Sequence, residues 1–143
     1  MARYVTTVES TRSREDAFAY LSDFSNALEW DPGVVGAERV DSGEVVVGSE
    51  FRLVTEFMGR KTPLTYRVVE LEAPRRVTFL AETGTLTSLD TITFERRGDG
   101  ASVTYDADLR LKGLLKLADP LLRLAFKSIG DKARDGLRTH LGG

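Results

Sequence analysis

Asp90 and Tyr105 are the two residues of this sequence whose types and positions most clearly suggest chemistry. Each lies in a segment that alternates polar and apolar residues, which places both side chains on the apolar face of a predicted strand. Apolar surroundings hold a carboxylic acid in its neutral form, and a nearby phenol can polarise a carbonyl oxygen. The pair could therefore enolise a carbonyl or expel water. Two alternatives remain open: Asp90 lines a ligand cavity, or it accepts a hydrogen bond from Tyr105 or Ser88 and only stabilises the sheet.

Other reactive constellations are weak. The chain has one histidine and no cysteine, so disulfides, thiolate chemistry and zinc–thiolate sites are excluded, and no acidic run has EF-hand spacing. His140 is predicted to be a hydrogen-bonded or half-exposed side chain near the C-terminus rather than a metal ligand or catalytic base. A Ser-His-Asp triad would need it to meet a serine such as Ser88, and no nucleophile elbow is present. The glycines at 98 and 100 lack the spacing of a phosphate-binding loop and indicate a hairpin turn. We therefore expect no metal and no redox cofactor.

Composition and charge describe one ordinary globular domain over residues 1–143. The chain is 41% hydrophobic and 29% charged, with 20 basic and 22 acidic residues and a net charge of −2. This balance gives no electrostatic footprint for nucleic acid. No signal peptide or membrane span is visible, so we expect a cytoplasmic protein without stable membrane insertion.

Turn and capping signals predict the elements that would position the carboxyl and the phenol. A first strand covers residues 6–10, and a helix begins near Ser13, which starts a capping-box pattern. Asp23 is expected to cap a second short helix that runs to about Trp30. Residues 34–111 read as consecutive strands, with turn signals between them. This order predicts an α+β domain of about seven antiparallel strands, with two short helices after the first strand.

Alternation also assigns the faces of the predicted sheet. The inner face is predicted to carry Phe51, Thr55, Phe57, Tyr66, Phe79, Ser88, Asp90 and Tyr105. Antiparallel partners share a face, so each hairpin must pair inner residues with inner residues. Two-residue loops at 60–61, 83–84 and 98–99 satisfy this condition. The predicted pairs are Thr55 with Tyr66, Phe79 with Ser88, and Ile92 with Tyr105, which leaves Asp90 diagonal to Tyr105.

The chain ends in a predicted helix of about 22 residues. Asp119 is expected to be its N-cap, and Pro120 suits its first turn. Its apolar arc consists of Leu122, Ala125, Phe126, Ile129, Ala133, Gly136, Leu137 and His140. A single helix covers a sheet only if the sheet curls around it. Gly130 and Gly136 indicate close backbone approach or room for a ligand, and a tolerated surface glycine is the alternative for Gly130.

These elements and several local motifs resemble the START-like, or SRPBCC, helix-grip superfamily over nearly the whole chain. The motifs are residues 14–23 (REDAFAYLSD), Asn26 with Trp30 and Pro32, the turn at 98–100 followed by 103–105 (VTY), and the leucine-rich terminal helix. The chain looks most like the small bacterial polyketide cyclase/dehydrase-like branch. The resemblance implies a curved sheet around the helix with a cavity between them. It implies cyclases, carriers, quinone-binding proteins and chaperone-activating relatives alike, and no active-site motif transfers residue by residue.

Our leading hypothesis is binding or transport of a small hydrophobic or aromatic molecule, polyketide-, quinone- or lipid-like, between the sheet and the C-terminal helix. The residues predicted to line this cavity are Trp30, Phe51, Thr55, Phe57, Tyr66, Phe79, Ser88, Asp90, Tyr105, Phe126 and Ile129. The resemblance would place Trp30 near the cavity mouth, and an anchor for the helix-to-strand corner is the alternative. The rival function is a metal-independent polyketide cyclase/dehydrase, an aromatase-type lyase, with Asp90 and Tyr105 as catalytic candidates.

The segment from Leu114 to Leu124 holds more leucine than one helix face requires. Leu124 falls among the charged residues of the terminal helix. The pattern indicates an apolar surface that forms a homodimer contact, a site for another protein or a membrane-touching lid. The alternative is that the preceding segment covers it.

Overall fold

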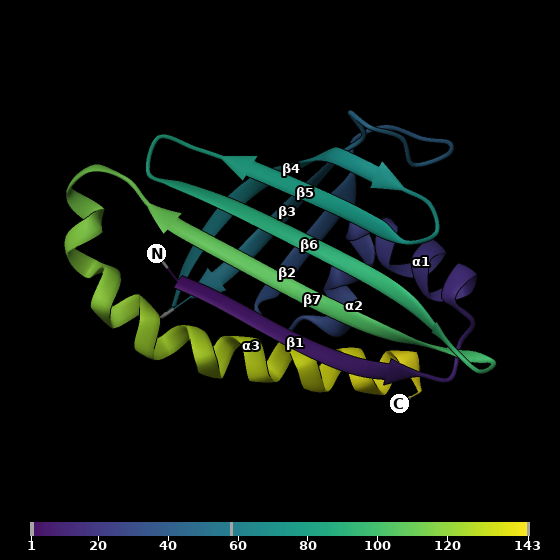
Figure 1. Ribbon diagram of the computed structural model, residues 1–143. Helices are drawn as coiled ribbons and strands as arrows, with labels where there is room; N and C mark the ends of the chain where they lie inside the picture. The colour runs from purple at the N-terminus through teal and green to yellow at the C-terminus, as the bar shows by residue number, and fades with distance from the viewer. Residues whose placement is uncertain (1, 58, 143) are drawn as a thin grey trace.

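In the computed structural model, which describes residues 2–57 and 59–142, a curved antiparallel sheet lies against a long C-terminal helix (Figure 1). The strands are β1 (Ala2–Ser10), β2 (Val34–Arg39), β3 (Glu50–Phe57), β4 (Arg60–Glu72), β5 (Arg76–Glu82), β6 (Leu86–Arg97) and β7 (Gly100–Leu111). The helices are α1 (Arg14–Ser22), α2 (Ala27–Trp30) and α3 (Asp119–Leu141), with the 3-10 helices η1 (Phe24–Asn26) and η2 (Gly113–Ala118). The predicted α+β helix-grip fold is confirmed.

The sheet has the strand order β1-β7-β6-β5-β4-β3-β2, and every neighbouring pair is antiparallel. The first strand therefore lies beside the last, and the short helices carry the chain to the opposite edge. In Figure 1, α1 and α2 lie at the same end of the molecule as the C-terminus, whereas α3 begins at the other end. The two ends of α3 consequently have different surroundings.

The β6–β7 hairpin has the predicted register. Ile92 pairs with Tyr105, and Asp90 pairs with Ala107, so the carboxyl of Asp90 lies diagonal to the phenol of Tyr105. The turn supplies the reason, because Gly98 adopts a φ of 57°, which suits glycine in a tight hairpin. The sequence signal was specific here.

The predicted pairs in the other two hairpins are wrong, although the faces are right. Phe79 pairs with Asp90 instead of Ser88, because the β5–β6 loop is longer and closes with a hydrogen bond from the Thr83 N–H to the Leu86 carbonyl (2.9 Å). Tyr66 pairs with Phe51 instead of Thr55, because β4 begins at Arg60. Residues 60–61, which were predicted to form the loop, already belong to the strand. The errors are two and four residues, and an even shift keeps each side chain on its face.

Capping explains where the helices begin. The Ser13 hydroxyl accepts a hydrogen bond from the Asp16 backbone N–H (3.1 Å), and the Asp23 carboxylate accepts one from the Ser25 N–H (3.2 Å), as predicted. The prediction that Asp119 caps α3 is wrong. Ala118 holds the cap position without a side-chain bond, because η2 already leads the chain into the helix in α conformation. In the described residues, no helix is long and apolar enough to cross a membrane.

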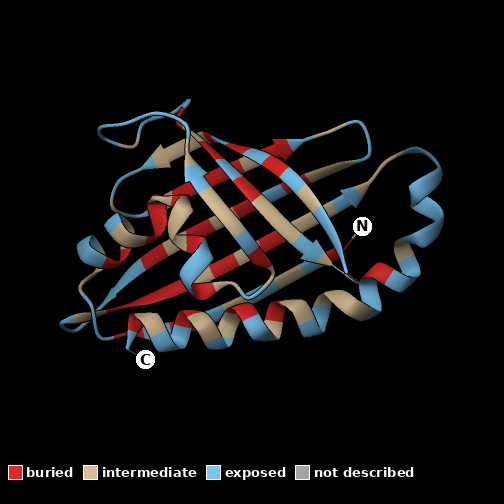
Figure 2. Cartoon of the chain, turned by 180° about the vertical axis from the view of Figure 1, so that it is seen from behind, coloured by how far each residue is buried: buried red, intermediate tan, exposed pale blue. Residues whose placement is uncertain are grey.

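Packing along α3 is uneven (Figure 2). Leu137 and Leu141 are fully buried, and the Leu141 carbonyl accepts a hydrogen bond from the Thr11 N–H (3.0 Å). A Cβ atom at Gly136 would overlap the carbonyl oxygen of Trp30, so the backbones approach closely there. In the first half of the helix, most apolar side chains are only half-buried or exposed.

The surface interpretation of Gly130 is wrong. Gly130 is buried, and a Cβ atom there would overlap the ring of Tyr4 from β1. The Tyr4 hydroxyl donates a hydrogen bond to the Asp131 carboxylate at 2.6 Å, which holds the ring against the helix. The middle of α3 is therefore attached to the edge strand of the sheet.

Candidate functional site

A cavity of about 290 Å³ lies between the inner face of the sheet and the first two thirds of α3. Strands β3, β4, β6 and β7 form one wall, and Leu122, Phe126, Ile129 and Ala133 of α3 form the other. The wall is mostly apolar because polar and apolar residues alternate along the strands, with the apolar ones facing inward, and because the apolar arc of the helix faces the sheet. This is the space expected when a strongly curved sheet is covered by one helix.

Most of the predicted cavity residues lie around this space. Those that line it are Thr55, Phe57, Tyr66, Ser88, Asp90, Tyr105, Phe126 and Ile129. Trp30, Phe51 and Phe79 do not line it, and each is at most 1% exposed in the core. Their prediction as cavity residues needs correction.

An aromatic cluster at the other end of the fold accounts for the difference. Phe24 of η1 enters the inner side of the sheet and stacks on Phe79 with a centroid distance of 4.1 Å, and Phe51 packs edge-on against Phe79 at 6.0 Å. Trp30, the last residue of α2, also lies on the inner side of the sheet and packs edge-on against Tyr105 at a centroid distance of 5.5 Å. Trp30 is thus the anchor of the helix-to-strand corner rather than a residue at the cavity mouth.

Asp90 and Tyr105 meet as predicted. The Tyr105 hydroxyl donates a hydrogen bond to Asp90 Oδ2 at 2.9 Å, whereas Ser88 pairs with the Tyr66 hydroxyl at 2.8 Å instead of with Asp90. Burial raises the pKa of Asp90 from 3.8 to about 7; the hydrogen bond from Tyr105 opposes this rise and the negative charge of Asp31 adds to it. The Asp90 carboxyl therefore exchanges its proton near neutral pH.

Asp31 is a polar cavity residue that sequence reasoning missed. It lies in the turn between α2 and β2, where its carboxylate accepts a hydrogen bond from the Gly33 N–H (2.9 Å) and lines the cavity. Burial raises its pKa from 3.8 to about 6, against the effect of that hydrogen bond. An Asp before Pro-Gly is an ordinary turn signal, so only the packing of α2 under the sheet distinguishes it.

The phenol and carboxyl groups of the cavity differ in protonation state. Burial raises the pKa values of Tyr66 and Tyr105 well above 10, so both phenols stay protonated and can donate hydrogen bonds. The two carboxyl groups can donate or accept, depending on pH. The arrangement can hold an apolar molecule by burial, orient a carbonyl or hydroxyl group on it, and transfer a proton near pH 7. Within residues 2–57 and 59–142, histidine and acidic side chains form no cluster of three that could hold a metal ion.

The raised pKa of Asp90 predicts a specific pH dependence of stability. Between about pH 4 and pH 7 the folded protein keeps a proton that the unfolded chain releases, so this group lowers the free energy of unfolding as the pH rises. Asp90→Asn removes this dependence, and its stability relative to the wild type is expected to increase by up to about 4 kcal/mol from pH 4 to pH 8. Urea unfolding across this range measures it. A difference that does not change with pH would contradict the raised pKa.

The family of the chain can be identified from its sequence. A family model described as polyketide cyclase/dehydrase and lipid transport matches residues 1–142. The sequence has no match among curated proteins.

Several solved structures share the fold. A START superfamily protein from Mycobacterium smegmatis is 16% identical with a TM-score of 0.80, over 99% of this chain and 98% of that one. A protein from Thermus thermophilus is 17% identical with a TM-score of 0.79, over 97% and 96% of the two chains. The ZhuI aromatase/cyclase from Streptomyces sp. R1128 is 13% identical with a TM-score of 0.75, over 98% and 91%. Likeness at such low identity establishes the fold alone.

Proposed function

The chain belongs to the polyketide cyclase/dehydrase and lipid transport family of START-like proteins, and we propose that it binds a small, largely apolar molecule between its sheet and α3. The observation that carries the proposal is the cavity of about 290 Å³, mostly apolar and with a few polar groups directed into it. Ligand sites commonly span about 300–1,000 Å³ and have this composition. The volume fits a small aromatic polyketide, a quinone ring or part of a lipid.

The polar groups of the wall restrict the chemistry of the ligand. The described lining contains four carboxyl groups, from Asp31, Glu56, Asp90 and Asp108, and no basic side chain. A ligand carboxylate or phosphate would find no cation in this lining, and its charge would raise the pKa values of Asp31 and Asp90 further. A neutral ligand with a carbonyl, phenol or hydroxyl group could instead bond to Asp90, Tyr105 or Tyr66.

Filling the cavity tests the proposal. Wild-type protein is expected to bind the neutral fluorescent probe N-phenyl-1-naphthylamine with saturation at one site, because the probe is apolar and aromatic. Ala133→Phe on α3 projects a ring into the cavity and is expected to weaken binding by about tenfold or more. The measurement is a fluorescence titration with circular dichroism of each variant.

Two further variants make the titration decisive. Ala107→Leu, a smaller change on β7 that also fills the cavity, is expected to weaken binding as well. It provides the test if the Ala133→Phe variant does not fold. Ala19→Phe, at an exposed position of α1 away from the cavity, is the matched control and should bind as the wild type does. Folded filling variants with unchanged affinity would show that the probe does not occupy this cavity and would refute the proposal.

A second candidate function is a metal-independent polyketide cyclase/dehydrase. The observation that favours it is the hydrogen bond from Tyr105 to Asp90, a carboxyl group whose pKa is raised to about 7. A general acid or base works best when its pKa lies near the ambient pH. Asp90→Asn keeps the shape of the side chain and removes its ionisable proton. Loss of product formation with retained ligand affinity would favour the enzyme over the carrier.

A further inference from the structure

The most exposed large apolar side chains of the described residues gather where η2 runs into α3. Leu114, Leu117 and Leu124 are 87%, 83% and 79% exposed, and Leu121 and Leu115 are 55% and 44% exposed. These five leucines are here called the leucine corner. Their own chain does not cover them, so the alternative in which the preceding segment does so is wrong. In Figure 1 the segment that carries the leucine corner, η2 and the first turns of α3, lies at the left edge, at the end away from α1 and α2.

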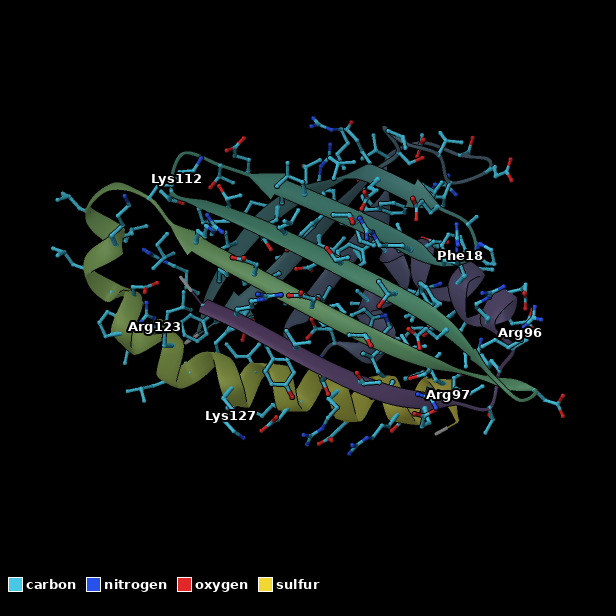
Figure 3. The ribbon with its side chains drawn as sticks, viewed as in Figure 1. Phe18, Arg96, Arg97, Lys112, Arg123 and Lys127 are labelled. Carbon is cyan, nitrogen blue, oxygen red and sulfur yellow. The ribbon has the colours of Figure 1, made fainter. Side chains whose placement is uncertain are left out.

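Basic residues surround the leucine corner. Residues 112–127 contain four basic residues, Lys112, Lys116, Arg123 and Lys127, and one acidic residue, Asp119. The segment therefore sums to +3 in a chain whose total is −2, and its ion-pair partners Glu82 and Asp131 reduce the local sum to +1. Figure 3 shows Lys112, Arg123 and Lys127 at this same end of the molecule.

The ion pairs of these basic side chains leave them accessible. Lys112 contacts Glu82 at 3.2 Å, Arg123 contacts Asp119 at 3.1 Å, and Lys127 contacts Asp131 at 2.9 Å. The three basic side chains are nevertheless 37%, 64% and 79% exposed, respectively. Exposed ion pairs are weak, so their cations can still respond to a negatively charged surface.

We propose that the leucine corner adsorbs to an anionic lipid bilayer, with the leucines among the acyl chains and the basic side chains at the lipid phosphates. Exposed leucine bordered by lysine and arginine is the composition of interfacial segments. Anionic lipid attracts basic residues within a Debye length of the surface. A second copy of the chain fits less well, because a symmetric contact would bring the same exposed lysine and arginine side chains together around the leucines.

Adsorption would place the cavity at the membrane. The same segment contributes Ala118, Leu121 and Leu122 to the cavity wall. An apolar molecule could then pass between the bilayer and the cavity without crossing bulk water. The adsorption itself does not depend on the proposed ligand, so the two proposals can fail separately.

Vesicle flotation of the full chain tests the inference. The protein is expected to float with vesicles of phosphatidylcholine containing about a third phosphatidylglycerol, and its binding to pure phosphatidylcholine vesicles should be weaker by about tenfold or more. Raising sodium chloride from about 0.05 M to about 0.5 M should release most of it. The double variant Leu117→Glu/Leu124→Glu should lose about tenfold or more in affinity for anionic vesicles. Both positions are exposed, so the variant should fold.

Matched controls come from other exposed positions. Val46→Glu/Val47→Glu changes two side chains that are 51% and 60% exposed in the β2–β3 loop and should bind as the wild type does. Lys116→Glu should weaken binding, whereas Arg97→Glu at the opposite end of the molecule should not (Figure 3). Absence of flotation at low salt, or flotation that the leucine variant does not change, would overturn the proposal. A homodimer in sedimentation analysis that Leu117→Glu/Leu124→Glu dissociates, without vesicle binding, would assign the surface to a second copy instead.

Discussion

Trp30→Ala is expected to lower the free energy of unfolding by about 3–5 kcal/mol, because it removes a large side chain that is fully enclosed. The indole is 1% exposed and packs on Tyr105 at 5.5 Å and on Phe24 at 6.5 Å. The indole packs between η1 and strand β7, and both elements are fixed by their other contacts. The cavity left by Trp30→Ala would therefore not close by a local shift of side chains. Urea unfolding followed by far-UV circular dichroism measures the loss, since Trp30 is the chain's only tryptophan and its fluorescence is lost with it.

The control for Trp30 is an aromatic residue of the cavity wall. Phe57 is half-buried and lines the cavity, so Phe57→Ala is expected to cost about 1 kcal/mol of stability. A mild Trp30→Ala and a severe Phe57→Ala would reverse the assignment and return Trp30 to the cavity mouth.

Gly136→Ala is expected to destabilise the protein by about 3 kcal/mol, against the usual effect of this change in a helix. Alanine inside a helix is normally favoured over glycine by about 0.5–1 kcal/mol. At Gly136 the added methyl would overlap the carbonyl oxygen of Trp30, and a backbone atom cannot turn aside as a flexible side chain can. Either α3 or α2 must move outward, which loosens the packing on both.

Equilibrium unfolding of a small glycine series measures this effect. Gly130→Ala meets the ring of Tyr4 instead of backbone and is expected to cost less, because the ring can shift at the expense of its bond to Asp131. Gly84→Ala, with open space around its Cβ position, is expected to change stability by less than about 0.5 kcal/mol. A Gly136→Ala protein more stable than the wild type would show that the two helices are not in close contact.

The faces of the strands could be predicted from sequence because their period is two. Any even error in register leaves each side chain on its predicted face, which is why Phe79 and Tyr66 lie on the predicted face although their predicted partners were wrong. Asp90 and Tyr105 were correctly brought together because the register of β6 and β7 was itself right. The register itself followed only where turn chemistry was explicit, at Gly98. Elsewhere loop length decided it, and several lengths fitted the same pattern.

The separation of core from cavity wall could not be predicted in the same way. Phe51 and Phe57 lie on one face of β3, yet the first is in the core and the second lines the cavity. The difference comes from Phe24, whose ring stacks on Phe79 and fills one end of the curved sheet, and no pattern within β3 indicates this contact. The position of Asp31 at the cavity likewise follows from the packing of α2 against β2 and α3. Both are consequences of tertiary packing rather than of local preference.

The uneven attachment of α3 divides the stability of the molecule into two parts. Its second half is held by Leu137, Leu141, the contact of Gly136 with Trp30 and the hydrogen bond from Thr11, whereas its first turns contribute few buried side chains. Amide protons are therefore expected to exchange through small local openings near Pro120 and only through global unfolding near Leu137. The C-terminal half of α3 is thus firmly packed on the fold, whereas its N-terminal half, which lines the cavity, is expected to detach more easily. Opening the cavity is therefore expected to need less free energy than unfolding the whole domain.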